Sequence, residues 1–147
     1  MAITASGAYG LSLEKMMIDT LGQSLEAETH KGLLVTDTYT PDFTTHDFRN
    51  DITNECTGTN YTAGGATITA TEITLAGGVL TWDFADPSWA SSTIANAMAH
   101  VAYTNVGADT TDQLILLLDF VTAVSTTAGT LLVAINASGA MTLDYTP

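Results

Sequence analysis

The alternation of apolar and threonine residues over positions 66–75 constrains the fold of this chain more than any other feature. Apolar residues at every second position, among them Ile68 and Ala70, are separated by single threonines, and the alternation resumes in the opposite phase at Ile73 and Leu75. A two-residue period places successive side chains on opposite faces of a β-strand. The segment is therefore predicted to be a half-buried strand, with a bulge or a bend where the phase changes.

A turn and a return strand follow this segment. Gly77-Gly78 is typical of a hairpin turn, and Leu80, Trp82 and Phe84 then alternate on one face of the predicted return strand. The apolar run at 114–121 is typical of a strand buried on both faces. Further strands are predicted at 33–39, 93–103, 129–135 and 141–145, the last two paired through a turn at 136–139. This pattern predicts an all-β fold, a single antiparallel β-sandwich that is jelly-roll-like.

The N-terminal region is predicted to be a short arm that contains a helix. Ser12 can cap a helix in which Leu13 and Met17 lie four residues apart, and Gly22 would end it. This helix either covers the mouth of the sheet or belongs to an arm that reaches a neighbouring subunit. We therefore divide the chain into an N-terminal arm over 1–29 and a β-sandwich domain over 30–147.

The charge of the chain restricts its partners. Three lysines and arginines stand against 16 aspartates and glutamates, which gives a net charge of −13. Such a surface repels phosphate backbones and anionic lipid headgroups, so we expect neither nucleic acid nor a membrane as a partner. We also expect no membrane span and no signal peptide, because the apolar runs are short and the N-terminus lacks a basic region. The 27 threonines suit the solvated faces of a sheet.

The titratable residues do not form a recognisable catalytic or metal-binding motif. Four carboxylates recur in one segment, at Asp42, Asp47, Asp51 and Glu55. Their spacing is not that of a calcium-binding loop and Arg49 lies among them, so we interpret them as helix caps or a solvated face. The three histidines are scattered, and the single Cys56 is interpreted as a small buried hydrophobe. We therefore expect no enzyme, no cofactor and no metal site.

Two glycines and two tryptophans complete the candidates. Gly64-Gly65 precedes a strand and lacks a following lysine, so we interpret it as a turn that needs positive φ and not as a phosphate-binding loop. Trp82 is in phase with Leu80 and is predicted to lie in the core. Trp89 lies beyond a turn and is a candidate surface or interface aromatic, which together with Trp82 could also form a platform for sugars.

Several short motifs follow one another between residues 33 and 65. They read Thr38-Tyr39-Thr40-Pro41, His46-Asp47, Asp51-Ile52-Thr53-Asn54-Glu55 and Gly58-Thr59-Asn60-Tyr61-Thr62-Ala63-Gly64-Gly65. In this order they resemble a family of small virion structural proteins of tailed bacteriophages. A looser resemblance continues through Trp89, the run from Ser91 to Ala95, and the segment from 131 to 143.

The resemblance implies a head decoration, or cement, protein on the outer capsid surface of the virion. Its partner would be the major capsid protein, and we expect self-association, as a homotrimer. The segment 39–65 is then either an extended interface loop or a set of turns. The candidate interface residues are Tyr39, Pro41, Phe43, Tyr61 and Trp89. Two alternatives are a neck, tail or fibre-associated virion protein and a carbohydrate-binding or lytic enzyme module.

Overall fold

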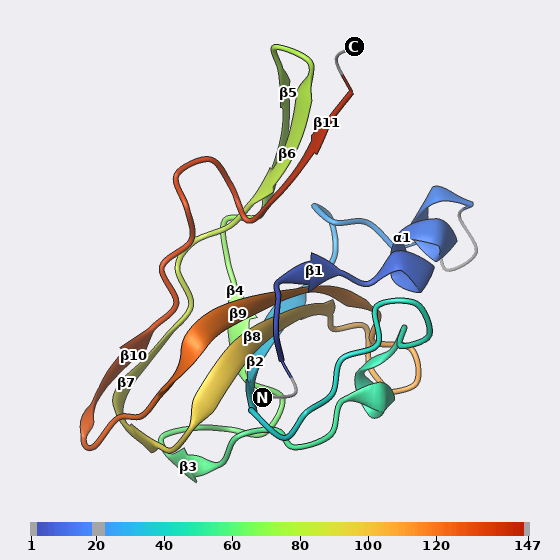
Figure 1. The fold of residues 1–147 in the computed structure, drawn as a ribbon. Coiled ribbons are helices and arrows are strands. Elements are labelled where there is room, and N and C mark those ends of the chain that lie inside the picture. The colour runs from blue at the N-terminus through green and yellow to red at the C-terminus, as the bar shows by residue number, and fades with distance from the viewer. Residues whose placement is uncertain (1–2, 19–22, 146–147) are drawn as a thin grey trace.

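The longest strands pair into a five-stranded antiparallel sheet, here called the main sheet (Figure 1). The computed structural model describes residues 3–18 and 23–145. In sheet order the strands are β1 (Gly7–Ala8), β9 (Leu114–Val124), β8 (Ala97–Thr104), β2 (His30–Thr36) and β4 (Ala66–Ile68). Every residue of β8 is buried, because this central strand has packed side chains on both faces. Double-sided burial explains why its sequence alternates only in part.

Two three-stranded sheets complete the fold. One has the order β10 (Gly129–Leu132), β7 (Ser88–Ile94) and β3 (Gly58–Thr59). The other has the order β11 (Met141–Asp144), β6 (Val79–Asp83) and β5 (Glu72–Ala76). This second sheet projects away from the main sheet (Figure 1). It is called the arm from here on and is distinct from the N-terminal arm predicted over residues 1–29.

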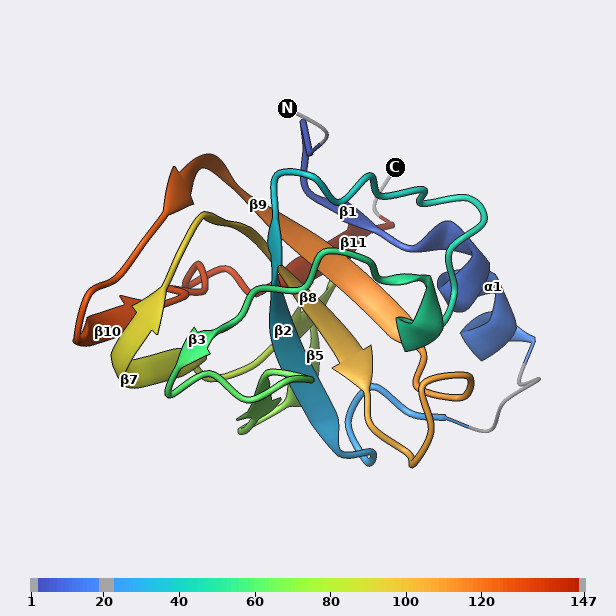
Figure 2. The same cartoon turned by 90° about the horizontal axis from the view of Figure 1, so that it is seen from below.

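The two faces of the main sheet are covered by different parts of the chain. On one face lies a core that includes Tyr9, Tyr39 and Leu117. The loop that follows β2 covers this core and crosses the sheet in Figure 2. On the opposite face, Trp82 of the arm and Phe84, which follows β6, pack on residues of β8 and β9 and form a second core. The main sheet therefore forms the middle layer of a sandwich-like arrangement.

The N-terminal segment belongs to the core of the molecule. β1 pairs with β9, and the side chains of Ile3 and Tyr9 are completely buried. Helix α1 (Gly10–Met17) follows, as expected, but its N-cap is Tyr9. The prediction that Ser12 caps the helix is wrong, because Ser12 lies within the helix and its hydroxyl donates to the backbone oxygen of Asp47 at 3.0 Å. The expected stop at Gly22 lies outside the described residues.

The all-β prediction is confirmed, and so is the hairpin at Gly77-Gly78, which joins β5 and β6. The phase change after residue 70 separates two sheets: β4 lies in the main sheet and β5 in the arm. The predicted pairing of the last two strands is wrong, because β10 pairs with β7 and β11 with β6. The loop between β2 and β3 contains one 3-10 turn, η1 (Arg49–Asp51). The jelly-roll order stays a prediction.

Within the described ranges, no helix has the length and apolar character needed to cross a membrane.

Candidate docking surface

Arg49 anchors the predicted interface loop to the body of the molecule. Its guanidinium forms an ion pair with Asp109, lies 3.9 Å from the Glu55 carboxylate and stacks over the ring of Tyr103, 5.6 Å from the centroid. The Arg49 backbone N–H donates to the backbone oxygen of Asp112 at 2.8 Å. These contacts fix the loop against the ends of β8 and β9.

Glu55 and Tyr61 fix the second half of the same loop. The Glu55 carboxylate accepts from the Tyr61 hydroxyl at 2.8 Å and from the Gly64 backbone N–H at 2.6 Å. The Tyr61 hydroxyl in turn accepts from the backbone N–H of Leu34 at 2.9 Å, beyond the first residue of β4, which pairs with Gly32. Tyr61 therefore satisfies a donor at the edge of the main sheet, and burial raises the pKa of its phenol.

The two glycines at the end of the loop are required by the packing. Gly64 and Gly65 have φ of 88° and 74°, as predicted for a turn in the left-handed region. A Cβ on Gly65 would lie 1.8 Å from the backbone oxygen of Gly32. The loop thus approaches β2 so closely that no side chain fits.

A chain of hydrogen bonds links the start of the loop to the N-terminal segment. The hydroxyls of Tyr9 and Tyr39 are 3.0 Å apart, and that of Tyr39 lies 3.0 Å from His46 Nδ1. Because Nδ1 also accepts from the Asp42 backbone N–H at 3.3 Å, the Tyr39 hydroxyl donates to it. Burial raises the pKa of Tyr39 to about 12, so both phenols stay protonated near neutral pH.

The carboxylates of the loop act as caps and ion pairs. Asp42 accepts from the backbone N–H groups of Thr44 and Thr45, and these bonds lower the pKa of Asp42. Asp51 accepts from two backbone N–H groups, and Asp47 pairs with Lys15. The interpretation as a helix cap therefore holds for Asp51 at η1, whereas Asp42 caps a turn and Asp47 forms an ion pair. Across residues 3–18 and 23–145, no group of three or more His, Cys, Asp or Glu side chains could hold a metal ion.

Two of the five predicted interface residues are buried inside the chain. Tyr39 is completely buried, and Trp89 is 5% exposed, so the expectation that Trp89 lies at the surface is wrong. Phe43 packs against Tyr9 with ring centroids 5.3 Å apart. Pro41, Phe43 and Tyr61 keep part of their surface exposed. Their role in an interface stays a prediction.

Trp89 belongs to a row of aromatic rings that joins the smaller sheets to the main sheet. The order is Tyr61, Trp89, His100, Phe84, Trp82 and His30, with neighbouring centroids 4.9–6.4 Å apart. Trp82 also donates its indole N–H to the Leu25 backbone oxygen at 2.9 Å. The base of the arm is therefore held rigidly on the second core.

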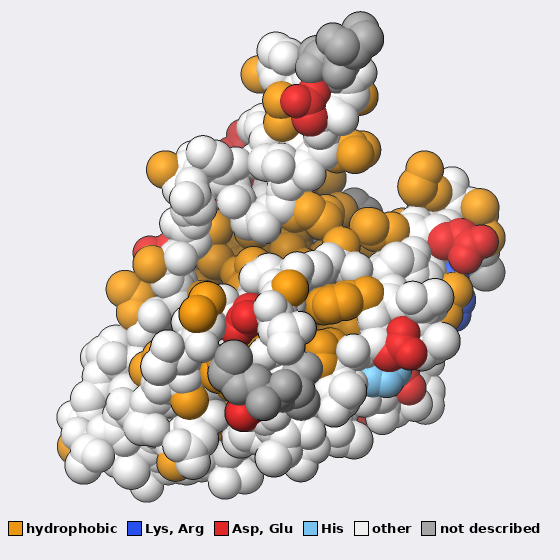
Figure 3. Space-filling model, viewed as in Figure 1, with side chains coloured by type: hydrophobic (Ala, Val, Ile, Leu, Met, Phe, Trp, Pro, Cys, Tyr) orange, Lys and Arg blue, Asp and Glu red, His pale blue; other side chains and the backbone are white. Residues whose placement is uncertain are grey.

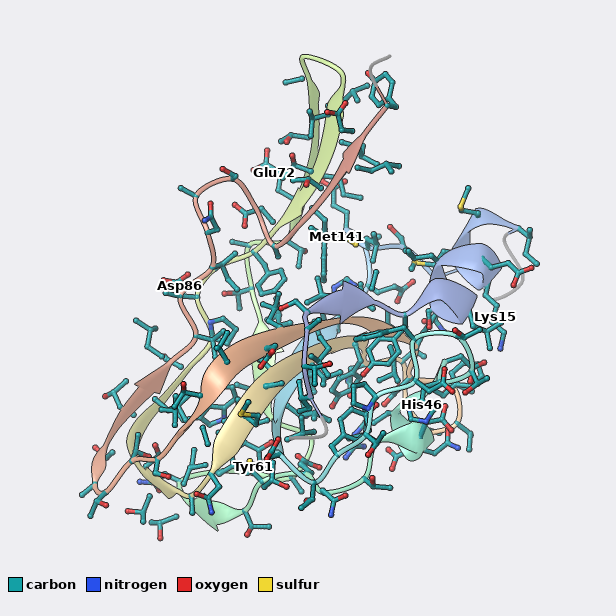
Figure 4. The ribbon with its side chains drawn as sticks, viewed as in Figure 1. Lys15, His46, Tyr61, Glu72, Asp86 and Met141 are labelled. Carbon is teal, nitrogen blue, oxygen red and sulfur yellow. The ribbon has the colours of Figure 1, made fainter. Side chains whose placement is uncertain are left out.

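A hollow opens beside the base of the arm, where hydrophobic side chains gather (Figure 3). Two adjoining pockets of about 420 and 180 Å³ share Ser6, Leu118 and Ala140. Among the described lining residues, Asp119 is the one titratable side chain. The lining combines apolar side chains such as Leu118 and Leu131 with the polar side chains of Ser6, Asp119 and Asn136. Met141 extends from the arm into the same region (Figure 4).

The arm itself has one polar and one apolar face. The register places Ile73, Trp82 and Met141 in one cross-strand row, which packs on the second core. The next row outward on the same face consists of Leu75, Leu80 and Leu143, which are 65%, 37% and 61% exposed. Here this row is called the leucine row.

The apolar face of the arm continues to its tip. The backbone N–H of Tyr145 donates to the Gly78 oxygen at 3.0 Å, which extends the pairing beyond β11. In this register, the side chain of Tyr145 follows that of Leu143 on the same face, and it is 58% exposed. On the opposite face, a matching row consists of Thr74, Thr81 and Thr142, with Glu72 nearby (Figure 4). An exposed apolar row with a polar reverse face is typical of a binding surface.

The sequence contains a partial signal for this surface, although none of the predicted interface residues lies on it. Leu75 and Leu80 face each other across the predicted hairpin, and Leu143 alternates with Thr142 and Asp144. The pairing of β11 with β6, which completes the row, joins segments about 60 residues apart and is not visible from local alternation.

Comparisons with known proteins add no relative to this picture. No protein-family model matches the chain. The curated proteins and the solved structures likewise give no significant match.

Proposed function

We propose that this chain is a structural protein of a tailed-bacteriophage virion that decorates the capsid. It binds the outer face of the shell formed by the major capsid protein and stabilises the head. The observation that carries this proposal is the leucine row, an apolar surface left open on an arm whose base is rigidly packed. The resemblance of segment 33–65 to virion proteins supplies the identity of the partner.

The state of the nucleophilic side chains supports a binding protein over an enzyme. Cys56 is buried and has no disulfide partner, and burial raises the pKa of its thiol to about 11. A thiol with this pKa is almost entirely protonated near neutral pH and is a weak nucleophile. The phenols of Tyr39 and Tyr103, whose pKa values burial raises to about 12, are equally unsuited to act as bases.

Decoration requires no chemistry beyond selective binding. A protein that binds the assembled shell and not its separated subunits stabilises that shell by mass action. The acidic surface, with a net charge of −13, keeps the chain away from packaged DNA and available for a protein partner.

A carbohydrate-binding module has less support. Such a module needs an exposed aromatic platform, for which the sequence offers Trp89 as the candidate. Trp89 is 5% exposed and Trp82 is 2% exposed, so neither ring offers a face to a sugar.

The test is the copy number of the chain in purified particles, measured by quantitative mass spectrometry against the major capsid protein. A decoration protein is expected at a ratio near one to one, or at a fixed simple fraction of it. A few copies per particle would place the chain at the neck, tail or fibre. Absence from particles would refute a virion role.

A further inference from the structure

On the basis of the capsid-binding function proposed above, we propose that the arm is the element that docks. It inserts the leucine row, with Tyr145, into an apolar cleft on the shell protein, and lysine or arginine side chains on the rim of that cleft face the acidic groups of the arm. The partner is thus defined by its chemistry: a protein surface that is apolar at its centre and cationic at its edge.

The apolar part of this assignment follows from exposure. Three leucines that are in register on adjacent strands remain 37–65% exposed, although in the row beneath them Trp82 is buried and Ile73 and Met141 are partly buried against the core. Folding of the chain therefore uses the inner row and leaves the outer row without a partner within the described residues. A contiguous group of large apolar side chains at the centre of an interface is where binding energy concentrates.

The cationic part follows from the distribution of charge. Residues 50–147 contain no lysine or arginine, and the arm carries Glu72 and Asp83. Of the three cations in the chain, Lys15 and Arg49 already pair with carboxylates of the same chain. A partner that brings basic groups to the edge of the arm gains from this field.

The same charge distribution argues against a second copy as the occupant. Another copy would bring a surface with the same excess of carboxylates toward an arm that has no cation of its own. Like charges that face each other across an interface oppose association. The hollow beside the arm, whose one titratable lining residue among those described is Asp119, offers no compensating positive charge.

The test uses the purified full chain and shells assembled from the major capsid protein of the same genome without this chain. Leu75→Ser and Leu143→Ser are expected to weaken shell binding about 10-fold or more each, because each removes an exposed side chain that becomes buried on docking. The matched controls are Thr74→Ser and Thr142→Ser, which lie in the corresponding row on the polar face and should bind like the unmodified chain.

A second pair of variants tests the cationic rim. Glu72→Gln on the arm is expected to reduce the dependence of binding on salt concentration, since it removes one of the charges on the polar face of the arm that attract a cationic rim. Glu14→Gln on α1 removes the same charge elsewhere and should leave that dependence unchanged. Circular dichroism of each variant establishes that it is folded.

The outcomes separate the two proposals. If the unmodified chain binds shells and the leucine variants bind equally well, the arm is not the docking element, although capsid binding stands. If the unmodified chain does not bind shells, the proposed function fails and the docking proposal fails with it. If the leucine variants instead abolish self-association in analytical ultracentrifugation and leave shell binding intact, the occupant is a second copy and the proposal is overturned.

Discussion

Acidification is expected to destabilise this protein through His100. The imidazole is completely buried on β8, between the rings of Phe84 and Trp89 and beside Gly32. Neither ring nitrogen has a hydrogen-bond partner among the described residues. Burial therefore lowers the pKa of His100 from 6.5 to about 4. Among the described residues, no charged side chain opposes this effect by stabilising an imidazolium.

The sign and the magnitude follow from this difference. Above the unfolded pKa of 6.5, His100 is neutral in both states and does not make stability depend on pH. As the pH falls from 6.5 toward 4, the unfolded chain binds a proton that the folded chain does not, so the free energy of unfolding decreases. Between about pH 7.5 and about pH 4 the loss is about 3 kcal/mol, at about 1.4 kcal/mol per pKa unit. Burial lowers the pKa of His30 in the same direction.

The assay is urea denaturation at a series of pH values for the unmodified chain and for His100→Leu. The difference in unfolding free energy between the two proteins isolates His100 from the many carboxylates, which titrate in both. Relative to its value near pH 7.5, this difference should shift by about 3 kcal/mol in favour of His100→Leu near pH 4. A pH-independent difference would show that His100 becomes protonated in the folded protein without penalty, and would refute the reasoning.

Three further substitutions test the packing. Gly32→Ala would place a Cβ 1.9 Å from His100 Nε2, so we expect the free energy of unfolding to fall by about 1–3 kcal/mol in chemical denaturation. His100→Ala in the same chain should restore part of this loss, and fully additive effects of the two substitutions would contradict the contact. Gly65→Ala should lower the free energy of unfolding more than Gly32→Ala does, because Gly65 also has positive φ and its Cβ would meet backbone atoms that cannot rotate away. An equal or smaller loss would count against the close approach of the loop to β2. Tyr61→Phe leaves the Leu34 N–H without its acceptor and should cost about 1–3 kcal/mol, with faster amide exchange at Leu34; an unchanged exchange rate would exclude this bond.

The sequence predicted what depends on local periodicity. The two-residue alternation and the Gly77-Gly78 turn identify β5 and β6, and the continuous apolar run identifies β9. The partners of β10 and β11 could not be predicted in this way, because each pairs with a strand that is about 40–60 residues earlier in the chain. Adjacency in sequence favours a hairpin of β10 and β11. Instead, Leu131 of β10 packs in one part of the core, and Trp82, which pairs with Met141 of β11, packs in another, so the two strands lie apart.

The same distinction explains the error over Trp89. Its position after a turn suggests exposure, but the stretch of β7 that begins there lies over the main sheet, and its burial depends on contacts with Tyr61 and His100. The capping role of Asp51 agrees with one of the two interpretations drawn from the sequence, because a carboxylate that caps nearby N–H groups acts within a few residues of its own position.

The placement of the motif residues bears on what the resemblance can imply. Tyr39, Tyr61 and Gly64-Gly65 carry much of it, and each has a role within this chain: a buried hydrogen bond, a cap on the edge of the main sheet and a close approach to β2. Residues of this kind specify how a loop packs, so a protein that shares them is expected to share the fold. The choice of partner depends on side chains that the fold leaves exposed, which here include the leucine row and Tyr145. A protein could therefore keep the motif and bind a different surface, and substitutions in the arm should change the partner without changing the fold.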